Sequence, residues 1–256
     1  MGTGAYFSGN ATYQDFGVAW MYDRHALELQ SGIKIVPGNK QSDYVAETIA
    51  TYDAIAADYK LTATPEMRTW VEESMRQFSG YLGGTRVLVP GCGDGRDSRF
   101  LRSLGLTVDS FDLSESMLSI ARAEDPEGNY FTLDLREIRK CPGPYDGIYA
   151  SGCLYHITKA EFPECVRLCR ALLSNRGIFY FNMKEGHGER IEHKPGPRYP
   201  GGIEAQRRLR GPRFYAYYQR DELLSMFSDF EILHEQKLLL GDGGFEFWMR
   251  KPDARR

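Results

Sequence analysis

Apolar residues recur with two different periods along this chain, and the period changes near Arg86. Before that residue the apolar positions lie three or four apart, which predicts helices. The first helical run starts at Ser42 and contains Val45, Ile49, Tyr52, Ile55, Ala56 and Tyr59. A second helix is expected from Thr64-Pro65, with Thr as the N-cap and Pro at the first helical position. Its buried face would hold Trp70, Val71, Met75 and Phe78, and Gly80, Gly83 and Gly84 would end it.

After Arg86, short apolar runs alternate with helical patterns. Strands are expected at 86–90, 107–111, 130–133, 145–150 and 177–183. Helices are expected at 95–104, after Ser114, and from Thr158 through Leu173, where Thr158 and Glu161 have capping-box spacing. Strands that alternate with helices of this length predict a mainly parallel sheet with helices on both faces.

The C-terminal part has a different pattern. A short helix at about 219–227 is followed by two apolar runs, Phe230–Leu240 and Phe245–Arg250, which Gly241-Asp-Gly-Gly separates. Two strands joined by such a turn form a hairpin, so the sheet is expected to finish with an antiparallel strand.

Residues 1–41 show no sustained period and are rich in Gly, Tyr, Asn and Gln. They also carry scattered aromatic residues, which are rare in disordered tails. Two interpretations remain open: an irregular arm that docks on the body or on a second subunit, and a partly mobile terminus.

Composition narrows the class of protein. The chain has 256 residues, 42% hydrophobic and 26% charged, with a net charge of −3, so binding to nucleic acid through bulk charge is not indicated. No apolar run is long enough to span a bilayer, and the N-terminus lacks a signal-peptide pattern, so a cytoplasmic protein is expected. The five cysteines have no zinc-like spacing; no metal site is expected, and most should be buried thiols.

The candidate chemistry follows the first three strands. A glycine-rich turn with Gly91, Gly93 and Gly95 comes after strand 86–90 and opens a helix. Asp112 ends the second strand, 17 residues after Gly95, where a carboxylate can accept both hydroxyls of a ribose. Asp134-Leu135 ends the third strand and can bracket an adenine. Because ligands of open α/β sheets bind beyond the carboxyl ends of the strands, this ordered set predicts a nucleotide-type site.

Each of these acids alone could equally be a helix or turn cap. The turn also departs from two common phosphate-binding loops. The last glycine of a dinucleotide turn is replaced by Arg96, and the Gly-Lys-Ser/Thr ending of a triphosphate loop is absent. The turn Gly-Cys-Gly-Asp-Gly therefore suits a smaller ligand without a pyrophosphate.

At these motifs the chain resembles the class I S-adenosylmethionine-dependent methyltransferases of the small-molecule type. The resemblance covers about residues 44–250. It rests on Tyr52–Tyr59, Val87–Gly95, Asp112–Met117, Asp134-Leu135 and Tyr145–Ile157, and on lid-like segments at Lys184–Glu189 and Arg213–Tyr218. It implies a Rossmann-like, doubly wound, mostly parallel seven-stranded sheet with an antiparallel final strand. It also implies an N-terminal helical cap and a lid inserted after strand five.

The resemblance implies roles for individual residues. Gly91, Gly93 and Gly95 would lie under the methionine part of S-adenosylmethionine. Asp112, with Leu113 and Met117 beside it, would hold the ribose, and Asp134 with Leu135 the adenine. Ser151 would line the methyl-transfer side, and Tyr52 and Tyr59 would close over the cofactor. The family often has an acid two residues before the first glycine, whereas this chain has Val89-Pro90. The contact to the cofactor's amino group must then come from elsewhere.

His156 is the candidate general base, and Tyr155 a second lining residue. The alternative is a histidine that only hydrogen-bonds the substrate or supports its loop. His187, Arg207 and Arg208 are weaker candidates for substrate contact in the segment 184–213. That segment holds eight Lys or Arg residues against four acids. It is interpreted either as a solvated mobile loop or as a lid that attracts an acidic acceptor.

We therefore expect an arm at 1–41, a helical cap at 42–84 and a methyltransferase domain at 85–256, with a lid at about 184–218. The expected activity is transfer of a methyl group from S-adenosylmethionine, leaving S-adenosylhomocysteine, to an oxygen or nitrogen of a small metabolite such as a natural-product intermediate. The alternatives are a peptide or protein acceptor, and a nucleotide-binding module without activity. No nucleic-acid or membrane partner is expected, and a monomer and a homodimer remain open.

Overall fold

Strand β1 (Arg86–Pro90) lies in the middle of the sheet and is buried on both faces. Val87 and Val89 pack into one apolar cluster and Leu88 into a second cluster on the opposite face. A strand covered on both sides reads as a continuous apolar run, which is why this segment was recognisable. The computed structural model describes residues 43–62, 65–193, 210–238 and 243–253, all within the compact unit Lys34–Arg256.

The main sheet has seven strands in the order β3-β2-β1-β4-β5-β9-β8. The first five, listed from the edge inward, are parallel: β3 (Asn129–Thr132), β2 (Thr107–Asp112), β1, β4 (Tyr145–Ala150) and β5 (Leu173–Lys184). The order reverses between β1 and β4, because β2 and β3 extend to one side and the later strands to the other. The ends of β1 and β4 therefore flank the switch point at which α/β sheets bind ligands.

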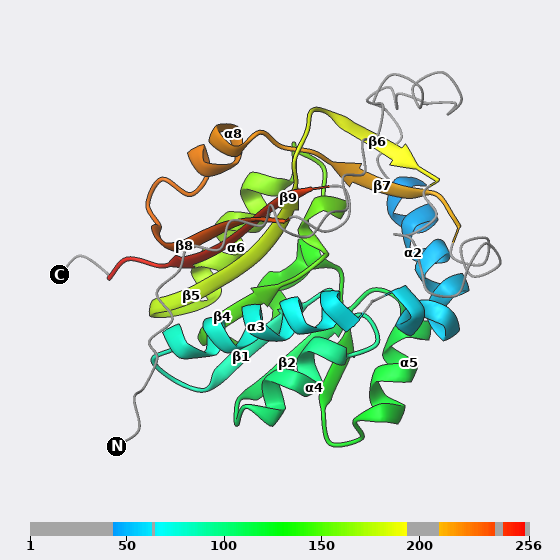
Figure 1. Cartoon of the computed structure of the whole chain (residues 1–256), viewed down its shortest axis with the longest axis horizontal. Coiled ribbons are helices and arrows are strands. Elements are labelled where there is room, and N and C mark those ends of the chain that lie inside the picture. The colour runs from blue at the N-terminus through cyan, green and yellow to red at the C-terminus, as the bar shows by residue number, and fades with distance from the viewer. Residues whose placement is uncertain (1–42, 63–64, 194–209, 239–242, 254–256) are drawn as a thin grey trace, which may run out of the picture. The chain divides into compact units, whose positions relative to one another are not determined.

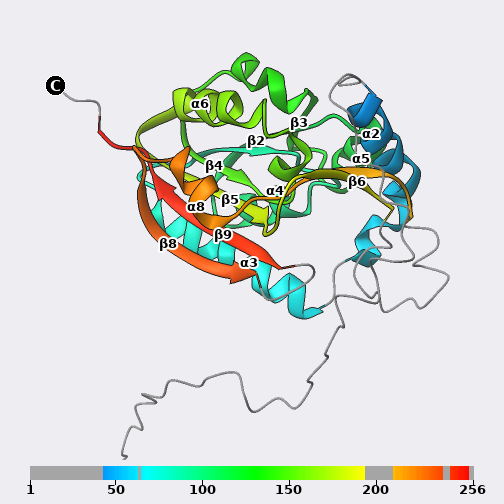
Figure 2. The same cartoon turned by 90° about the horizontal axis from the view of Figure 1, so that it is seen from above.

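Helices cover both faces of this sheet (Figure 2). One face packs on α3 (Pro65–Tyr81), α4 (Arg96–Ser103) and α5 (Glu115–Glu124), through residues such as Phe78, Leu101 and Leu118. The other face packs on α6 (Phe162–Leu172) and α8 (Arg220–Ser225), through residues such as Phe162 and Leu223. The predicted doubly wound sheet is confirmed.

The last two strands are antiparallel, as the Gly-rich turn between them predicted. Strand β9 (Gly244–Arg250) inserts between β5 and β8 (Glu231–Leu238) and is antiparallel to both. The tip of this hairpin, 239–242, lies outside the described residues.

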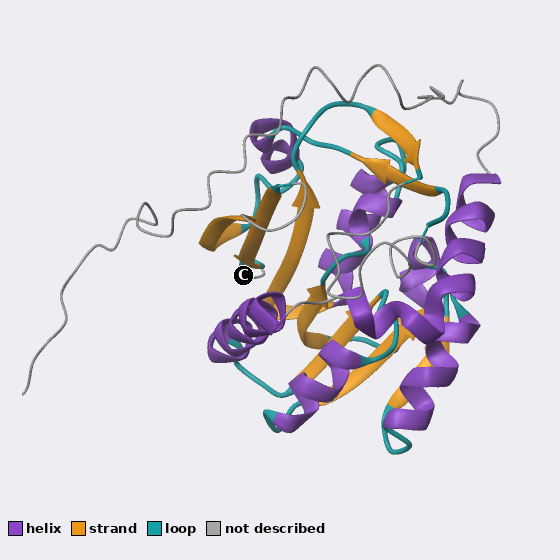
Figure 3. Cartoon of the chain, turned by 45° about the vertical axis from the view of Figure 1, so that its right-hand side comes forward, coloured by secondary structure: helices purple, strands orange, loops and turns teal. Residues whose placement is uncertain are grey.

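Two elements lie beyond the carboxyl ends of the central strands. Helix α2 (Asp43–Ile55) continues into the 3₁₀ helix η1 (Ala56–Thr62), and a separate two-stranded sheet is formed by β6 (Glu189–Glu192) and β7 (Arg213–Ala216). Figures 1 and 3 show α2 beside β7, with the β6–β7 pair apart from the main sheet. This small sheet was not predicted. Among the described helices, none combines the length and the apolar character that crossing a bilayer requires.

Some element boundaries differ from the expected ones. The first helix tightens to 3₁₀ geometry from Ala56, and β5 begins at Leu173 rather than 177. Helix α6 begins at Phe162, not at Thr158. The Thr158 hydroxyl accepts the Glu161 N–H at 3.3 Å, which is one half of the predicted capping box. It also donates to the Glu161 carboxylate, which binds Tyr44 of α2 as well. The Glu161 side chain therefore joins elements and does not supply the other half of the box. All five cysteines are buried free thiols, as expected.

A buried carboxyl joins the C-terminal strands to α3. Glu246 of β9 is 1% exposed and accepts hydrogen bonds from Trp70 Nε1 at 2.9 Å and Tyr180 Oη at 2.6 Å, and from the Gln236 side chain. Replacing Glu246 by Ala leaves three donors without their acceptor, so we expect Glu246→Ala to lower the free energy of unfolding by about 2–5 kcal/mol. The measurement is chemical denaturation followed by circular dichroism.

Glu231→Ala is the control, because Glu231 makes an exposed ion pair with Arg250 at the edge of the same hairpin. Its removal should cost no more than about 1 kcal/mol. Equal losses in the two variants would contradict a structural role for the buried carboxyl.

Candidate active site

The turn between β1 and α4 runs close to neighbouring elements. Gly91, Gly93 and Gly95 all have positive φ, at 63°, 54° and 76°. A Cβ at Gly91 would lie 2.3 Å from Cys153 Cβ, so only glycine lets β1 approach the loop after β4 there. At Gly93 a Cβ would meet only Tyr59, at 3.8 Å, and would project into open space. The turn thus presents bare backbone toward that space.

Asp112 ties the end of β2 to this turn. Its Oδ2 accepts the Gly93 N–H at 2.8 Å and its Oδ1 accepts the Ser114 N–H at 2.9 Å, ahead of α5. Burial raises the pKa of this carboxyl, and the backbone donors act in the opposite direction. The carboxylate is fixed in place, and each of its oxygens keeps lone pairs for a further donor.

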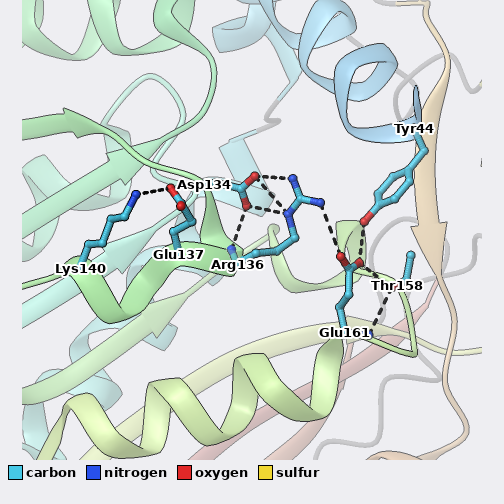
Figure 4. A network of polar contacts seen from close by, with 7 residues as sticks. All are labelled: Tyr44, Asp134, Arg136, Glu137, Lys140, Thr158 and Glu161. Atoms are coloured by element: carbon cyan, nitrogen blue, oxygen red, sulfur yellow. Dashed lines mark hydrogen bonds and ion pairs between the residues drawn. The ribbon is translucent and has the colours of Figure 1, made fainter. Parts of the chain in front are cut away.

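Asp134 belongs to a larger polar network, shown in Figure 4. It caps the 3₁₀ helix η2 (Leu135–Lys140) by accepting the Arg136 N–H, and it also binds the Arg136 guanidinium at 2.5 and 3.0 Å. Arg136 reaches on to Glu161, which accepts the hydroxyl proton of Tyr44 at 2.8 Å. Burial raises the pKa of Asp134, but the hydrogen bonds from Arg136 and its positive charge lower it more. The pKa of Asp134 therefore lies below its usual range. The network fastens α2 to the sheet edge.

His156 follows β4, in the short helix η3 (Leu154–His156), and both of its ring nitrogens are engaged. Nδ1 lies 2.6 Å from the carbonyl oxygen of Phe214, which can only accept, so Nδ1 carries the proton. Nε2 then accepts the hydroxyl proton of Tyr52 at 2.9 Å. Burial, together with the nearby positive charges of Arg213 and Lys184, lowers the pKa of His156 to about 3, so the ring is neutral at pH 7.

These groups converge on one partly open cavity, whose space of about 840 Å³ includes some open solvent. All of the predicted cofactor residues except Gly95 line it: Tyr52, Tyr59, Gly91, Gly93, Asp112, Leu113, Met117, Asp134, Leu135 and Ser151. His156 lines it as well. Asp112 and Asp134 thus face the same space, as the nucleotide-type site requires.

The other predicted site residues lie elsewhere. Tyr155 is half-buried beside His156, with ring centroids 4.7 Å apart, but does not line the cavity. Gly95 packs against Ala121 and Tyr130. His187 is exposed on the segment before β6. Arg207 and Arg208 lie outside the described residues.

Several lining residues were missed. Val45, Thr48 and Ile49 lie on the same face of α2 as Tyr52, and their helical spacing could have indicated them. Arg136 had no signal beyond its place two residues after Asp134. The positions of Arg213 and of the Phe214 carbonyl, which do not line the cavity, depend on how β7 folds back against α2 and η3, which no local pattern encodes.

Residues 87–177, which contain the turn, both acids and His156, match the family model described as a methyltransferase domain. This chain contains a methyltransferase domain. The match begins at β1 and ends in β5, so it covers the five parallel strands of the sheet.

Curated relatives of this methyltransferase domain act on different acceptors. The ubiquinone biosynthesis O-methyltransferase of Bordetella pertussis is 32% identical over 118 residues, which are 44% of this chain and 46% of that protein. The mouse N-terminal Xaa-Pro-Lys N-methyltransferase 1 is 28% identical over 149 residues, 55% of this chain and 67% of that protein. The chain thus spans about half the length of the O-methyltransferases that it matches.

Solved structures extend the likeness to most of the fold. The CcbJ methyltransferase from Streptomyces caelestis has a TM-score of 0.61 at 18% identity, over 81% of this chain and 99% of that one. DhpI in complex with SAH has a TM-score of 0.62 at 18% identity, over 83% and 98%. The predicted Rossmann-like methyltransferase fold is therefore confirmed.

The neutral state of His156 is testable. We expect ¹⁵N NMR of histidine-labelled protein to show a neutral ring protonated on Nδ1 at pH 5, well below its ordinary pKa of 6.5. The His156→Gln variant identifies the signal by its loss. A ring that takes up a proton near pH 6.5 would contradict the buried, doubly hydrogen-bonded arrangement.

The lowered pKa of His156 also has a consequence for the stability of the protein. Below pH 6.5 the unfolded chain binds a proton at His156 that the native state does not bind until about pH 3. The free energy of unfolding should therefore fall as the pH decreases through this window. We expect His156→Gln to show a shallower fall in urea denaturation measured at pH 7, 6 and 5. An identical slope in both proteins would contradict the shift.

Proposed function

We propose that this protein is an S-adenosylmethionine-dependent methyltransferase that acts on an oxygen or nitrogen of a small metabolite. The observation that carries the proposal is the single cavity into which the glycine turn, Asp112 and Asp134 all face, within a methyltransferase domain.

The residues present fit this cofactor. The backbone at Gly93 leaves open the space that a Cβ would fill, which suits the methionine part. Asp112 is a buried, fixed carboxylate that can accept the hydroxyls of a ribose. Leu135 and Asp134 would bracket the adenine, with Arg136 holding the Asp134 carboxylate in place. Tyr52 and Tyr59 would cover the cofactor from the side of α2 and η1, and Ser151 would line the reacting end.

Methyl transfer from S-adenosylmethionine requires the protein mainly to align the reacting groups. S-adenosylmethionine supplies a methyl group on a sulfonium, a good leaving group, so the site must orient the acceptor in line and exclude water. The aromatic side chains of Tyr52 and Tyr59 and the apolar residues of α2 would exclude water from the cavity.

The role of His156 as general base stays a prediction. A neutral imidazole has the lone pair that a base needs, but Nε2 already accepts the Tyr52 proton. A proton from an acceptor would have to reach Nε2 through the Tyr52 hydroxyl, or after Tyr52 moves.

The kind of methyl acceptor is inferred only by analogy with the names of similar proteins. Relatives named for ubiquinone biosynthesis favour a small molecule methylated on oxygen, and a natural-product intermediate remains our preferred acceptor. The relative named as an N-terminal Xaa-Pro-Lys N-methyltransferase favours the second candidate, a peptide or protein acceptor. The cytoplasmic location and the choice between monomer and homodimer stay predictions.

Calorimetry tests the proposal. The protein should bind S-adenosylmethionine and S-adenosylhomocysteine, with no comparable binding of NAD. Asp112→Ala should weaken binding of S-adenosylhomocysteine by about 10- to 100-fold, because it removes a charged hydrogen-bond acceptor worth about 1.5–3 kcal/mol.

Asp229→Ala is the matched control, since Asp229 forms a half-exposed ion pair with Arg170 and does not line the cavity. NAD binding tighter than S-adenosylmethionine, or equal affinities in the two aspartate variants, would contradict the proposed function.

A further inference from the structure

The turn that follows β4 is held at two points. The Gly152 N–H donates to Oδ1 of Asn182, a half-buried residue of β5, at 2.8 Å. Next to it, Cys153 lies so close to the glycine turn that a Cβ at Gly91 would be 2.3 Å from the Cys153 Cβ. Gly152 has a φ of 75°, a conformation that favours glycine. Ser151, Gly152 and Cys153 all line the cavity.

The hydrogen bond to Asn182 fixes the direction of one peptide group. A backbone N–H can only donate, so the atom of the Asn182 amide that faces it is the oxygen. The Ser151–Gly152 peptide is trans, so its carbonyl points opposite to its N–H. Strand β4 lies between β1 and β5. An N–H directed at β5 therefore turns the Ser151 carbonyl toward the side of β1 and its glycine turn.

The Ser151 carbonyl oxygen is available to a ligand. Within residues 43–62, 65–193, 210–238 and 243–253, no group donates a hydrogen bond to it. Ser151 lines the cavity together with Gly91 and Gly93, where the proposed function places the methionine part of the cofactor. A partial negative charge thus lies at the end of the cavity that would hold the sulfur.

We propose that Asn182 is a positioning residue that makes the site prefer the charged cofactor, S-adenosylmethionine, to its neutral product, S-adenosylhomocysteine. It acts through the Ser151 carbonyl, whose oxygen it directs toward the sulfonium. This inference rests on the proposed function and adds to it a residue that no sequence motif indicated.

The preference follows from the charge on sulfur. A sulfonium attracts a peptide carbonyl, because the oxygen end of the peptide dipole is negative. The attraction is stronger in a site sheltered from water than in bulk solvent. The sulfur of the product is a neutral thioether, so the same carbonyl gives it no such stabilisation. The Ser151 carbonyl therefore favours replacement of the product by fresh cofactor after each turnover.

The contact acts on binding and not on the rate of methyl transfer. The positive charge on sulfur decreases as the methyl group leaves, so the carbonyl stabilises the bound cofactor at least as much as the transition state. Asp112 and Asp134 are assigned to the ribose and the adenine, which cofactor and product share. Loss of the oriented carbonyl should therefore change the relative affinities of the two compounds.

Calorimetry with both compounds measures this preference as the ratio of the association constant of S-adenosylmethionine to that of S-adenosylhomocysteine. Asn182→Leu keeps the size of the side chain but removes the amide oxygen. It should lower the ratio by about 3- to 10-fold, the range expected for one hydrogen bond. Asn182→Asp keeps an oxygen that accepts the Gly152 N–H, so its ratio should equal or exceed that of the wild type. Asn182→Ala is a second deletion of the acceptor, and circular dichroism shows which variants are folded.

Asn129→Leu is the matched control. Asn129 donates to Asp109 at 2.7 Å from the start of β3, at the end of the parallel strands opposite to the cavity. Its replacement removes an asparagine hydrogen bond without contact to the Ser151–Gly152 peptide, so the ratio should stay at the wild-type value.

A second measurement leaves Asn182 in place. Serine labelled with ¹³C at the carbonyl, combined with ¹⁵N-labelled glycine, selects Ser–Gly peptides in NMR spectra. Ser151→Ala identifies the Ser151–Gly152 signal by its loss. The ¹³C shift of this signal should change more when S-adenosylmethionine binds than when S-adenosylhomocysteine binds.

The outcomes separate the two proposals. Failure of the wild-type protein to bind either compound would overturn the proposed function. The role of Asn182 alone would be overturned if both compounds bind but the folded Leu and Ala variants keep the wild-type ratio. The same conclusion would follow if Asn182→Asp or Asn129→Leu lowered the ratio as much as Asn182→Leu, or if both compounds changed the ¹³C shift equally.

Discussion

The hydrogen bond from the Gly93 amide to the Asp112 carboxylate is the contact on which the site depends, because it joins the turn after β1 to the end of the neighbouring strand β2, beside the switch point between β1 and β4. It fixes the glycine turn against the end of β2. The second oxygen of Asp112 does the same for the start of α5. One side chain therefore sets the relative positions of the three backbone segments that form the floor of the cavity.

The opposite wall is built from segments far apart in sequence. Thr51 of α2 donates to the Pro212 carbonyl at 2.7 Å, and the Phe214 amide donates to Thr48 at 3.0 Å. The Phe214 carbonyl binds His156, which binds Tyr52 in turn. Helix α2, strand β7 and the loop after β4 are thus one hydrogen-bonded unit. The Tyr44–Glu161–Arg136 contacts attach this unit to the sheet edge.

The parallel part of the fold could be predicted from the sequence because its strands are short apolar runs that alternate with helical patterns, and the central strands β1 and β4 are buried on both faces. The order of the glycine turn, Asp112 and Asp134 along the chain was enough to place them together, since parallel strands bring their carboxyl ends to one edge. The small β6–β7 sheet could not be predicted in this way. Its strands are four residues long and mix charged with apolar residues, so neither shows a clear period.

The positive charges that act on His156 could not be predicted from the sequence either. A lysine at the end of a strand and an arginine in a basic segment are ordinary surface residues until the chain folds back and packs rings against them. Arg213 is buried only because β7 lies between α2 and η3. The helical spacing of Val45, Thr48, Ile49 and Tyr52, in contrast, did contain the information that one face of α2 covers the cavity.

Strand β7 is held in place largely through its main chain, at Pro212 and at both polar groups of Phe214. Peptide groups are the same whatever side chain they carry, so these hydrogen bonds do not depend on which residues make them. The side chains of β7 add a second attachment, because all four are buried and Phe214 packs on Tyr44 of α2. Exchange of a side chain on this strand would therefore alter its packing while the main-chain connection between α2, β7 and the loop after β4 is kept.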